Sequence, residues 1–350
     1  MTRSAGPVAP GARPRDRAGT GHAACHHGEI LQGVFLDERR RPCHGLVTLP
    51  MTGPGTRAAF RLLPDTPPDQ VAVTPAGRSK AARAAVLAVR ECAARRHEEP
   101  CGGELRLSGD IPVGLGMGSS TSDVIATVRA VADSYGLRLP PETVARLAVR
   151  AEQASDPLML DSGALLFAHR EGRVLEVLGA ALPPAVVVGC SLGGGTPVDT
   201  LSLPARACGA HDLATYEHLR RMLRRAVADS DPALLGQVAT ASARLSQHTL
   251  RHEEFTGLTA IADRVGATGV QIAHSGNVAG ILFDPATPGL NRRLHACTRA
   301  LAGEGITPTR TFTTRPTPTT EDASHGRTHL GGHRPTGPDT SRRRTRLPSL

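Results

Sequence analysis

The sequence of 350 residues contains no tryptophan, and aromatic residues make up only 2% of it. With so few rings, the core has to be built from alanine, valine and leucine, and little surface is left for stacking nucleic-acid bases. Lysine is nearly absent too, because Lys80 is the single lysine among 41 basic residues. No stretch approaches the ~20 apolar residues of a membrane span. We therefore expect no membrane segment.

The sequence also shows no spacing pattern typical of paired cysteines and no apolar leader. The seven cysteines are scattered along the chain, and the N-terminus is rich in proline, glycine and arginine. Free thiols in a reducing cytoplasm are the expectation. The net charge of +9 is concentrated in residues 1–20 and 315–350, which lack hydrophobic periodicity. We expect two disordered tails, and no basic face that would favour nucleic acid as a partner. The oligomeric state stays open.

The most informative segment runs from Pro112 to Asp123 and reads PVGLGMGSSTSD. An alternating, strand-like pattern precedes it at 104–107, and apolar residues at helical spacing follow as far as about Gly136. Glycine allows close approach of the backbone to a ligand, and a helix N-terminus attracts anions. The order strand, glycine loop, helix therefore predicts a phosphate-binding loop. The alternative is a tight turn capped by serine. The segment is neither a P-loop nor a dinucleotide fingerprint.

This segment resembles the phosphate-binding motif of the galactokinase, homoserine kinase, mevalonate kinase and phosphomevalonate kinase (GHMP) superfamily. Two further stretches are similar to the other family motifs. Residues 27–33, HGEILQG, resemble the first motif of the L-threonine kinase branch, and residues 274–280, HSGNVAG, resemble the third. The resemblance covers about residues 20 to 314.

The resemblance implies an α+β, two-domain GHMP kinase fold. Residues 21–180 would form the N-terminal ATP-binding domain, which is like domain 2 of ribosomal protein S5, and residues 181–314 a ferredoxin-like C-terminal domain. The implied activity is ATP-dependent transfer of the γ-phosphate to the hydroxyl of L-threonine or a similar amino-acid alcohol. In that branch the product enters cobalamin biosynthesis. A homoserine-like acceptor, or a catalytically inactive ligand-binding member of the fold, is the alternative.

The resemblance also assigns the ATP and Mg²⁺ ligands. The nucleotide would be bound by Pro112, Gly114, Leu115, Gly116, Met117, Gly118, Ser119, Ser120 and Thr121. Mg²⁺ prefers hard oxygen ligands and keeps several waters. Ser120 and Glu152 would supply such oxygens, although Glu152 could equally be a solvated charge at a helix end.

The catalytic residue implied by the resemblance is Asp156, in the segment ASDPLM. It would orient or deprotonate the acceptor hydroxyl. A structural alternative is that Asp156 only turns the chain before Pro157. Asp161 is the rival carboxylate, because mevalonate kinases place their base further beyond the glutamate.

Substrate contacts are expected from the first and third motifs. Glu29 would bind the substrate amino group or make a structural hydrogen bond beneath the loop. Gln32 would hold the substrate carboxylate or a backbone strand. His274, Ser275 and Gly276 would let the backbone approach the substrate.

Several residues depart from the family pattern or offer other chemistry. His27 stands where the threonine kinase branch has cysteine, and Gln153 stands where it tends to have an acid. No lysine lies near the first motif, so a charge clamp would have to come from Mg²⁺, helix dipoles or arginine. Zinc-ligand types cluster at residues 25–27 and 43–44, but without a Cys-x₂-Cys pair they argue only weakly for zinc.

Overall fold

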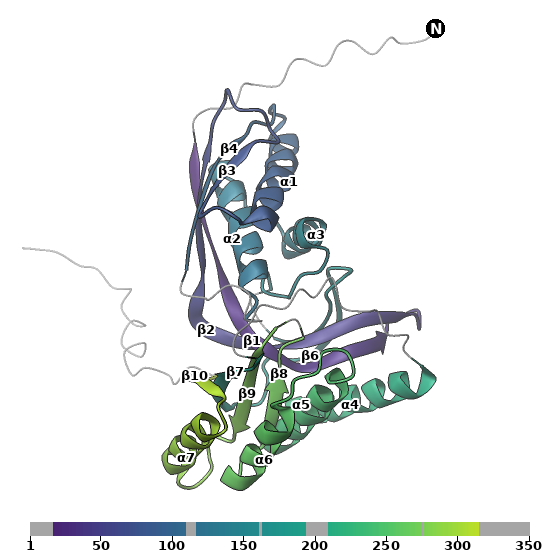
Figure 1. Cartoon of the computed structure of the whole chain (residues 1–350). Helices are drawn as coiled ribbons and strands as arrows, with labels where there is room; N and C mark the ends of the chain where they lie inside the picture. The colour runs from purple at the N-terminus through teal and green to yellow at the C-terminus, as the bar shows by residue number, and fades with distance from the viewer. Residues whose placement is uncertain (1–16, 110–116, 161–162, 194–208, 275, 315–350) are drawn as a thin grey trace, which may run out of the picture. The chain divides into compact units, whose positions relative to one another are not determined.

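The protein is described by a computed structural model that covers residues 17–109, 117–160, 163–193, 209–274 and 276–314. The tail 315–350 and the first sixteen residues lie outside these ranges. Figure 1 shows the arrangement of the helices and strands. The strands are β1 (Ala18–Leu36), β2 (Pro42–Leu62), β3 (Val71–Thr74), β4 (Gly103–Gly109), β5 (Ala164–Ala168), β6 (Arg173–Gly179), β7 (Val186–Ser191), β8 (Gly269–Ile272), β9 (Val278–Phe283) and β10 (Thr307–Thr313). The helices are α1 (Ser79–Arg96), α2 (Ser119–Ser134), α3 (Pro141–Glu152), α4 (Ala210–Ala228), α5 (Pro232–Ser246), α6 (Phe255–Val265) and α7 (Leu290–Gly303).

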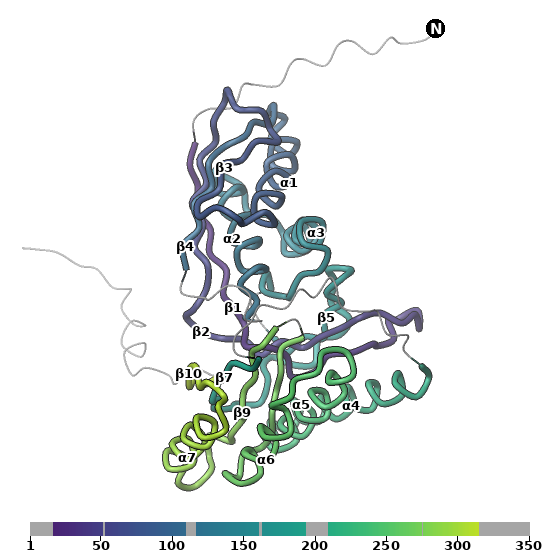
Figure 2. The backbone as a smooth tube through the Cα atoms, viewed as in Figure 1, coloured from purple at the N-terminus to yellow at the C-terminus, as the bar shows by residue number. Residues whose placement is uncertain are grey.

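The described strands belong to one sheet with the order β10-β7-β9-β8-β1-β2-β4-β3; β5 joins it through β2, and β6 pairs with β5. β3 pairs with β4 in parallel, whereas the other pairs are antiparallel. β1 and β2 run together from Ala18 opposite Arg61 to Leu36 opposite Pro42. Figure 2 shows that these two strands bend together. One pair of strands thus packs against α2 at one end and against α4 and α5 at the other.

The bend in β1 lies at the first sequence motif. The register between β1 and β2 shifts three times between Ala24 and Leu31, and Gly28 has a φ of +67°. A side chain at Gly28 would collide with Gln271. Such bulges bend a strand and redirect its side chains. The motif residues therefore leave the regular alternation and point toward α2 and β8.

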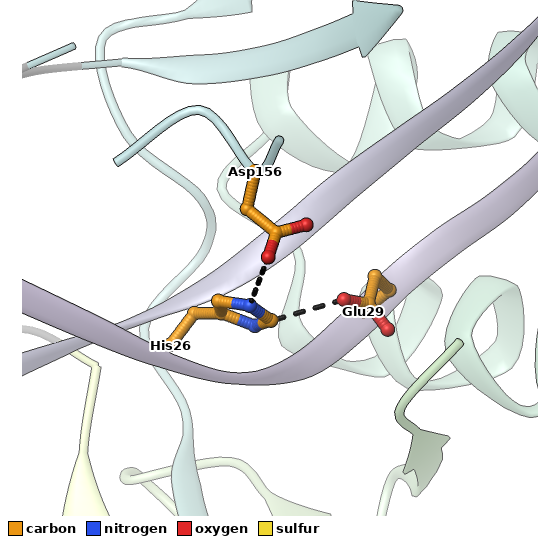
Figure 3. A group of neighbouring side chains, drawn as sticks. All are labelled: His26, Glu29 and Asp156. Atoms are coloured by element: carbon orange, nitrogen blue, oxygen red, sulfur yellow. Dashed lines mark hydrogen bonds and ion pairs between the residues drawn. The ribbon is translucent and has the colours of Figure 1, made fainter. Parts of the chain in front are cut away.

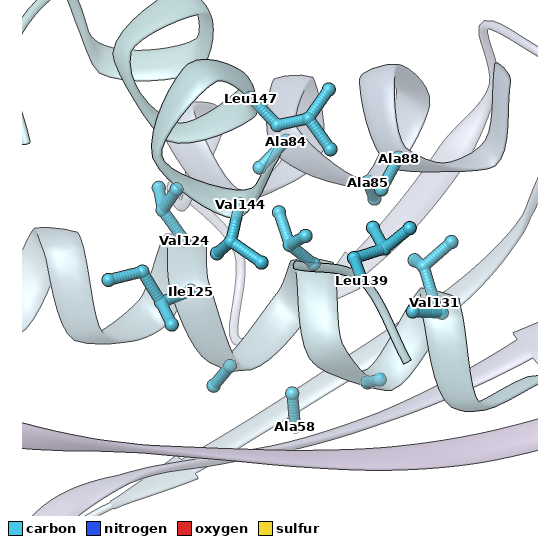
Figure 4. Close-up of a cluster of buried hydrophobic side chains, with 14 of the residues drawn as sticks. Ala58, Ala84, Ala85, Ala88, Val124, Ile125, Val131, Leu139, Val144 and Leu147 are labelled. Atoms are coloured by element: carbon cyan, nitrogen blue, oxygen red, sulfur yellow. The ribbon is translucent and has the colours of Figure 1, made fainter. Parts of the chain in front are cut away.

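Three hydrophobic clusters form the core, and small residues build most of the first one. In that cluster α2 packs on β1 and β2, and α1 and α3 pack on α2 and on each other, with Ala84, Ala85 and Ala88 facing Val131 and Leu147 across the helix interfaces (Figure 4). The second cluster lies under α4 and α5, and the third under α6 and α7. The expected core of alanine, valine and leucine is confirmed.

Glycines in β1 let α2 lie directly on the strand. Side chains at Gly19 and Gly21 would collide with the backbone of α2 at Ala126 and Ala130. Because the helix backbone approaches so closely, the start of α2 is fixed relative to the bend in β1. This contact brings the glycine loop and the first motif together.

The expected boundary of the N-terminal tail is wrong at its end. β1 is one long strand that begins at Ala18, inside the segment 1–20 that we expected to be disordered. Within the described ranges, no helix has the length and apolar character needed to cross a membrane.

Candidate active site

The N-terminus of α2 forms one end of the site. Gly118 precedes the helix with a φ of +66°, and a side chain there would collide with the imidazole of His26. Only glycine fits both the left-handed backbone and this contact. Among the described residues no side chain caps α2, so its first amides, from Ser119 onward, are available to an anion. Pro112, Gly114, Leu115 and Gly116 lie outside the described residues.

Ser120 and Glu152 meet beside this helix end. Ser120 Oγ donates to Glu152 Oε2 at 3.0 Å. Glu152 is the last residue of α3 and is buried, and its Oε1 atom is buried with no hydrogen-bond partner among the described residues. Burial, followed by the negative charge of Asp156, raises the pKa of Glu152 to about 7. A carboxylate oxygen without a partner, next to a hydroxyl, is a donor set that fits Mg²⁺.

Asp156 lies next to the same helix end and is paired with a histidine. Its Oδ2 accepts from His26 Nε2 at 3.0 Å and from Thr121 Oγ1 at 3.3 Å. Ser155 N donates to His169 O at 2.8 Å, which fixes the segment before Asp156. Burial alone would raise the pKa of Asp156, but the charge of His26 outweighs it and holds this pKa well below its usual range. Asp156 therefore stays ionised.

His26 is the cationic partner that the sequence did not reveal. Burial lowers its pKa, but the charge of Asp156 more than offsets this, and the net result is a pKa of about 9. We expected Mg²⁺, a helix dipole or arginine to supply positive charge near the first motif. The imidazolium of His26 supplies positive charge there. The two residues are 130 positions apart in the chain. No local signal in the sequence connects them.

Glu29 occupies the other side of the His26 ring. Its Oε2 accepts from His274 N at 2.5 Å. Its Oε1 lies 3.6 Å from His26 Nδ1 and forms an ion pair with His274 Nδ1 at 3.1 Å. The structural hydrogen bond that we considered for Glu29 is therefore present, and its second oxygen faces the two histidines.

His26, Glu29 and Asp156 offer ligand atoms within 4.8 Å of one another. Figure 3 shows, however, that the imidazole stands between the two carboxylates and directs a different nitrogen to each. One metal ion cannot bind both faces of the ring, and a protonated imidazole has no free lone pair. The arrangement is therefore an ion-pair chain rather than a metal centre.

The residues considered as zinc ligands have separate partners. Cys25 Sγ contacts Met51 Sδ at 3.8 Å, and Cys43 Sγ donates to Phe35 O at 3.4 Å. Burial raises the pKa of Cys25 to about 11, so its thiol stays protonated at neutral pH. These contacts disfavour a shared zinc site.

Two other residues of the first motif have structural contacts. His27 Nδ1 lies 2.7 Å from Gln271 Nε2, and its ring packs on Phe312 with centroids 5.0 Å apart. Burial, followed by the charge of His26, lowers the pKa of His27 to about 3. Gln32 Nε2 donates to Ile272 O at 3.1 Å, which is the backbone contact named as one of its two alternatives.

A second histidine pair completes the site. The rings of His169 and His274 lie with centroids 5.4 Å apart, and the Nδ1 atom of His169 is buried without a hydrogen-bond partner among the described residues. Burial and the charge of His274 lower the pKa of His169 to about 3. Burial would lower the pKa of His274, but Glu29 outweighs it and raises this pKa. His169 belongs to none of the three motifs and was not expected.

The structure thus brings most of the described candidates to one place. Met117 through Thr121 lie at the start of α2, Glu152 and Asp156 beside them, and Glu29 and His274 beyond His26. Gly276 is buried in the adjoining turn. Ser275 and Asp161 lie outside the described residues, so the choice between Asp156 and Asp161 depends on the geometry of Asp156 alone.

Comparison with known proteins points to one family of kinases. Residues 80–162 match the family of GHMP kinases N terminal domains. This part of the chain is a GHMP kinase N-terminal domain. L-threonine kinase from Salmonella typhimurium is 30% identical over 174 residues, which cover 50% of this chain and 57% of that protein. This chain therefore matches less than two thirds of the length of that curated relative.

Solved structures support the expected α+β GHMP kinase fold. Homoserine kinase from Cytophaga hutchinsonii aligns with a TM-score of 0.60 at 15% identity and covers 88% of this chain and 96% of its own. MDDEF in complex with MVAPP, AMPPCP and magnesium aligns with a TM-score of 0.58 at 14% identity, covering 85% of this chain and 97% of that one. At such identities the similarity shows the fold and leaves the substrate open.

Proposed function

We propose that the protein is an ATP- and Mg²⁺-dependent kinase that phosphorylates the hydroxyl of L-threonine or a closely related amino-acid alcohol. The observation that carries the proposal is the contact of both carboxylates with the start of α2. Ser120 bonds to Glu152, and Thr121, the next residue, bonds to Asp156. A metal-binding group and a base therefore flank the predicted phosphate site. Phosphoryl transfer needs this arrangement, because catalysis consists mainly of positioning and charge stabilisation.

Each group has a defined role in the proposed reaction. The amides of α2 and the glycine loop bind the phosphates of ATP. Ser120 and Glu152 would hold Mg²⁺, which would neutralise charge on the phosphates. The acceptor oxygen attacks the γ-phosphorus, the bond to the β–γ bridging oxygen breaks, and ADP leaves with that electron pair. Asp156 orients the acceptor hydroxyl and takes its proton as the new O–P bond forms and makes the attacking oxygen acidic. His26 keeps Asp156 ionised until then.

The spacing of Asp156 and Glu29 favours an amino-acid alcohol as the acceptor. Oxygens of these two carboxylates lie within 4.8 Å of each other. An acceptor with its hydroxyl and ammonium on neighbouring carbons can place the hydroxyl at Asp156 and the ammonium at Glu29. The similarity to an L-threonine kinase supports the same class. We also retain the two domains, residues 21–180 and 181–314, as part of this proposal.

A substrate panel tests the proposal. The purified full chain would be incubated with Mg-ATP and L-threonine, L-serine, L-homoserine or mevalonate, and ADP release and the phosphorylated product would be measured. We expect turnover of L-threonine above the other acceptors. Turnover of L-homoserine or mevalonate without L-threonine would reject the acceptor and keep the reaction class. Nucleotide binding without phosphate transfer to any acceptor would instead support an inactive ligand-binding member.

A further inference from the structure

The strands β1, β2 and β4 carry helices on one face, and their other face is open. Figure 1 shows α1, α2 and α3 together on one side of these strands. A side chain at Gly21 would collide with α2, so Gly21 points toward that helix. Its neighbours Thr20 and His22 point the other way, because successive residues of a strand alternate, and both are exposed. The open face thus lies behind the helices that carry the catalytic residues.

The open face contains a hollow of about 450 Å³. This volume falls within the roughly 300–1,000 Å³ of small-molecule sites. Two cross-strand rows of exposed residues line the hollow, and they are His22, Arg57 and Ser108 in one row and Thr20, Ala59 and Arg106 in the other. The short side chain of Ala59 stands between the longer ones and leaves room above the strand.

Arg57 and Arg106 are the charged groups of this hollow. They are diagonal neighbours on β2 and β4, which places them roughly 7–8 Å apart, so both side chains can reach one ligand. Neither guanidinium has a hydrogen bond or ion pair with another described residue. No acidic residue lines the hollow. Asp133, which accepts from Thr20 N at 2.7 Å, belongs to α2 and lies outside the lining. The hollow therefore suits an anion.

The donors of the hollow match phosphate better than carboxylate. A guanidinium presents paired N–H groups that fit the oxygens of a phosphate. The hydroxyls of Thr20 and Ser108 and the imidazole of His22 can add further donors, whereas one carboxylate has only two oxygens to accept them. The lining contains no phenylalanine, tyrosine or tryptophan on which a nucleobase could stack. The phosphate groups of a ligand would therefore supply most of its contacts.

We propose that this hollow is a second anion site, which binds a small molecule carrying two linked phosphate groups between Arg57 and Arg106. One phosphate fills the fork of one guanidinium, so two arginines on a diagonal favour a diphosphate over a single phosphate. The inference goes beyond the proposed kinase activity and does not depend on it, because none of the lining residues belongs to the site at the start of α2.

The test is calorimetric titration of the full chain with inorganic pyrophosphate, in EDTA so that no Mg²⁺ assists binding at the catalytic site. We expect the wild type to bind pyrophosphate about tenfold more tightly than orthophosphate. Arg57→Gln/Arg106→Gln removes both charges and should weaken pyrophosphate binding by roughly ten- to a hundred-fold. Arg83→Gln/Arg90→Gln removes the same charge from exposed positions of α1 and should leave the affinity unchanged.

A third variant tests the position of the ligand. Ala59→Glu keeps both arginines but places a carboxylate between them, and it should abolish pyrophosphate binding. Equal affinities of the wild type and Arg57→Gln/Arg106→Gln would show that pyrophosphate binds elsewhere and would overturn the proposal. Equal losses in the two double variants would show a general effect of net charge and would overturn it as well. So would an absence of pyrophosphate binding to the wild type. Failure of the kinase assay would leave these results unaffected.

Discussion

Glu152 and Asp156 are two buried carboxylates four positions apart, and their surroundings shift their pKa values in opposite directions. Glu152 faces a hydroxyl and has an oxygen without a partner, so burial dominates and its pKa rises to about 7. Asp156 faces an imidazolium, so its pKa falls despite burial. Pairs of titratable groups with separated pKa values are typical of active sites in which the two residues have different roles. Both carboxylates are buried, so the opposite shifts of their pKa values come from the groups beside them and not from burial.

The largest expected effect concerns Asp156. Asp156→Asn removes the proton acceptor and the partner of His26, so we expect turnover of L-threonine to fall by roughly 10²–10⁴-fold. ADP release measures the loss, and far-UV circular dichroism checks the fold. A variant that retains a third of the activity would show that Asp156 is not the base and would return attention to Asp161.

Glu152→Gln sharpens the comparison because it affects activity and stability in opposite directions. Without the carboxylate, we expect the Mg²⁺ concentration needed for half-maximal rate to rise by roughly ten- to a hundred-fold. The raised pKa of Glu152 means that the metal-free fold loses stability as the pH rises from about 4.5 to about 7. Glu152→Gln should remove that loss and stabilise the metal-free protein at pH 8 by about 1–3 kcal/mol. Chemical denaturation with EDTA present measures it. A destabilised variant would contradict this account of Glu152.

Gly118→Ala tests whether the loop and His26 are in contact. Gly118 and Gly136 have nearly the same φ, +66° and +64°, but a side chain at 136 meets nothing within 4 Å. Gly136→Ala thus carries only the backbone cost, about 1 kcal/mol. Gly118→Ala carries in addition the collision with the imidazole, which should raise the total to about 2–4 kcal/mol. Equal free energies of unfolding for the two variants would show that the ring does not pack on Gly118.

The pH dependence of stability should reveal the ion pair of His26. Because its pKa rises from 6.5 to about 9, its contribution is fully present below about pH 6.5 and is lost as the pH rises through 9. The difference in unfolding free energy between wild type and His26→Gln should therefore shrink by about 1–3 kcal/mol between pH 6 and 9.5. A difference that is constant across this range would mean that His26 is neutral in the folded protein.

The sequence indicated candidate residues for the site but not the contacts between them. Ser120, Glu152 and Asp156 could be named because their residue types and spacing resemble a family motif. β1 was not predicted as one strand, because the glycines and bulges around Gly28 interrupt the alternation that marks a strand. The contacts of Asp156 with His26 and of His274 with His169 join segments more than a hundred residues apart, and a single sequence carries no record of such pairs.

The most direct test of the account is a side-chain titration of the two carboxylates in the metal-free protein. Carbon-13 chemical shifts of Glu152 and Asp156, assigned with Glu152→Gln and Asp156→Asn, would be followed from pH 4 to 9 with and without Mg²⁺. The account predicts that Glu152 titrates near pH 7, that Mg²⁺ moves this midpoint downward, and that Asp156 remains ionised throughout. Two carboxylates titrating together near pH 4, with no response to Mg²⁺, would contradict it.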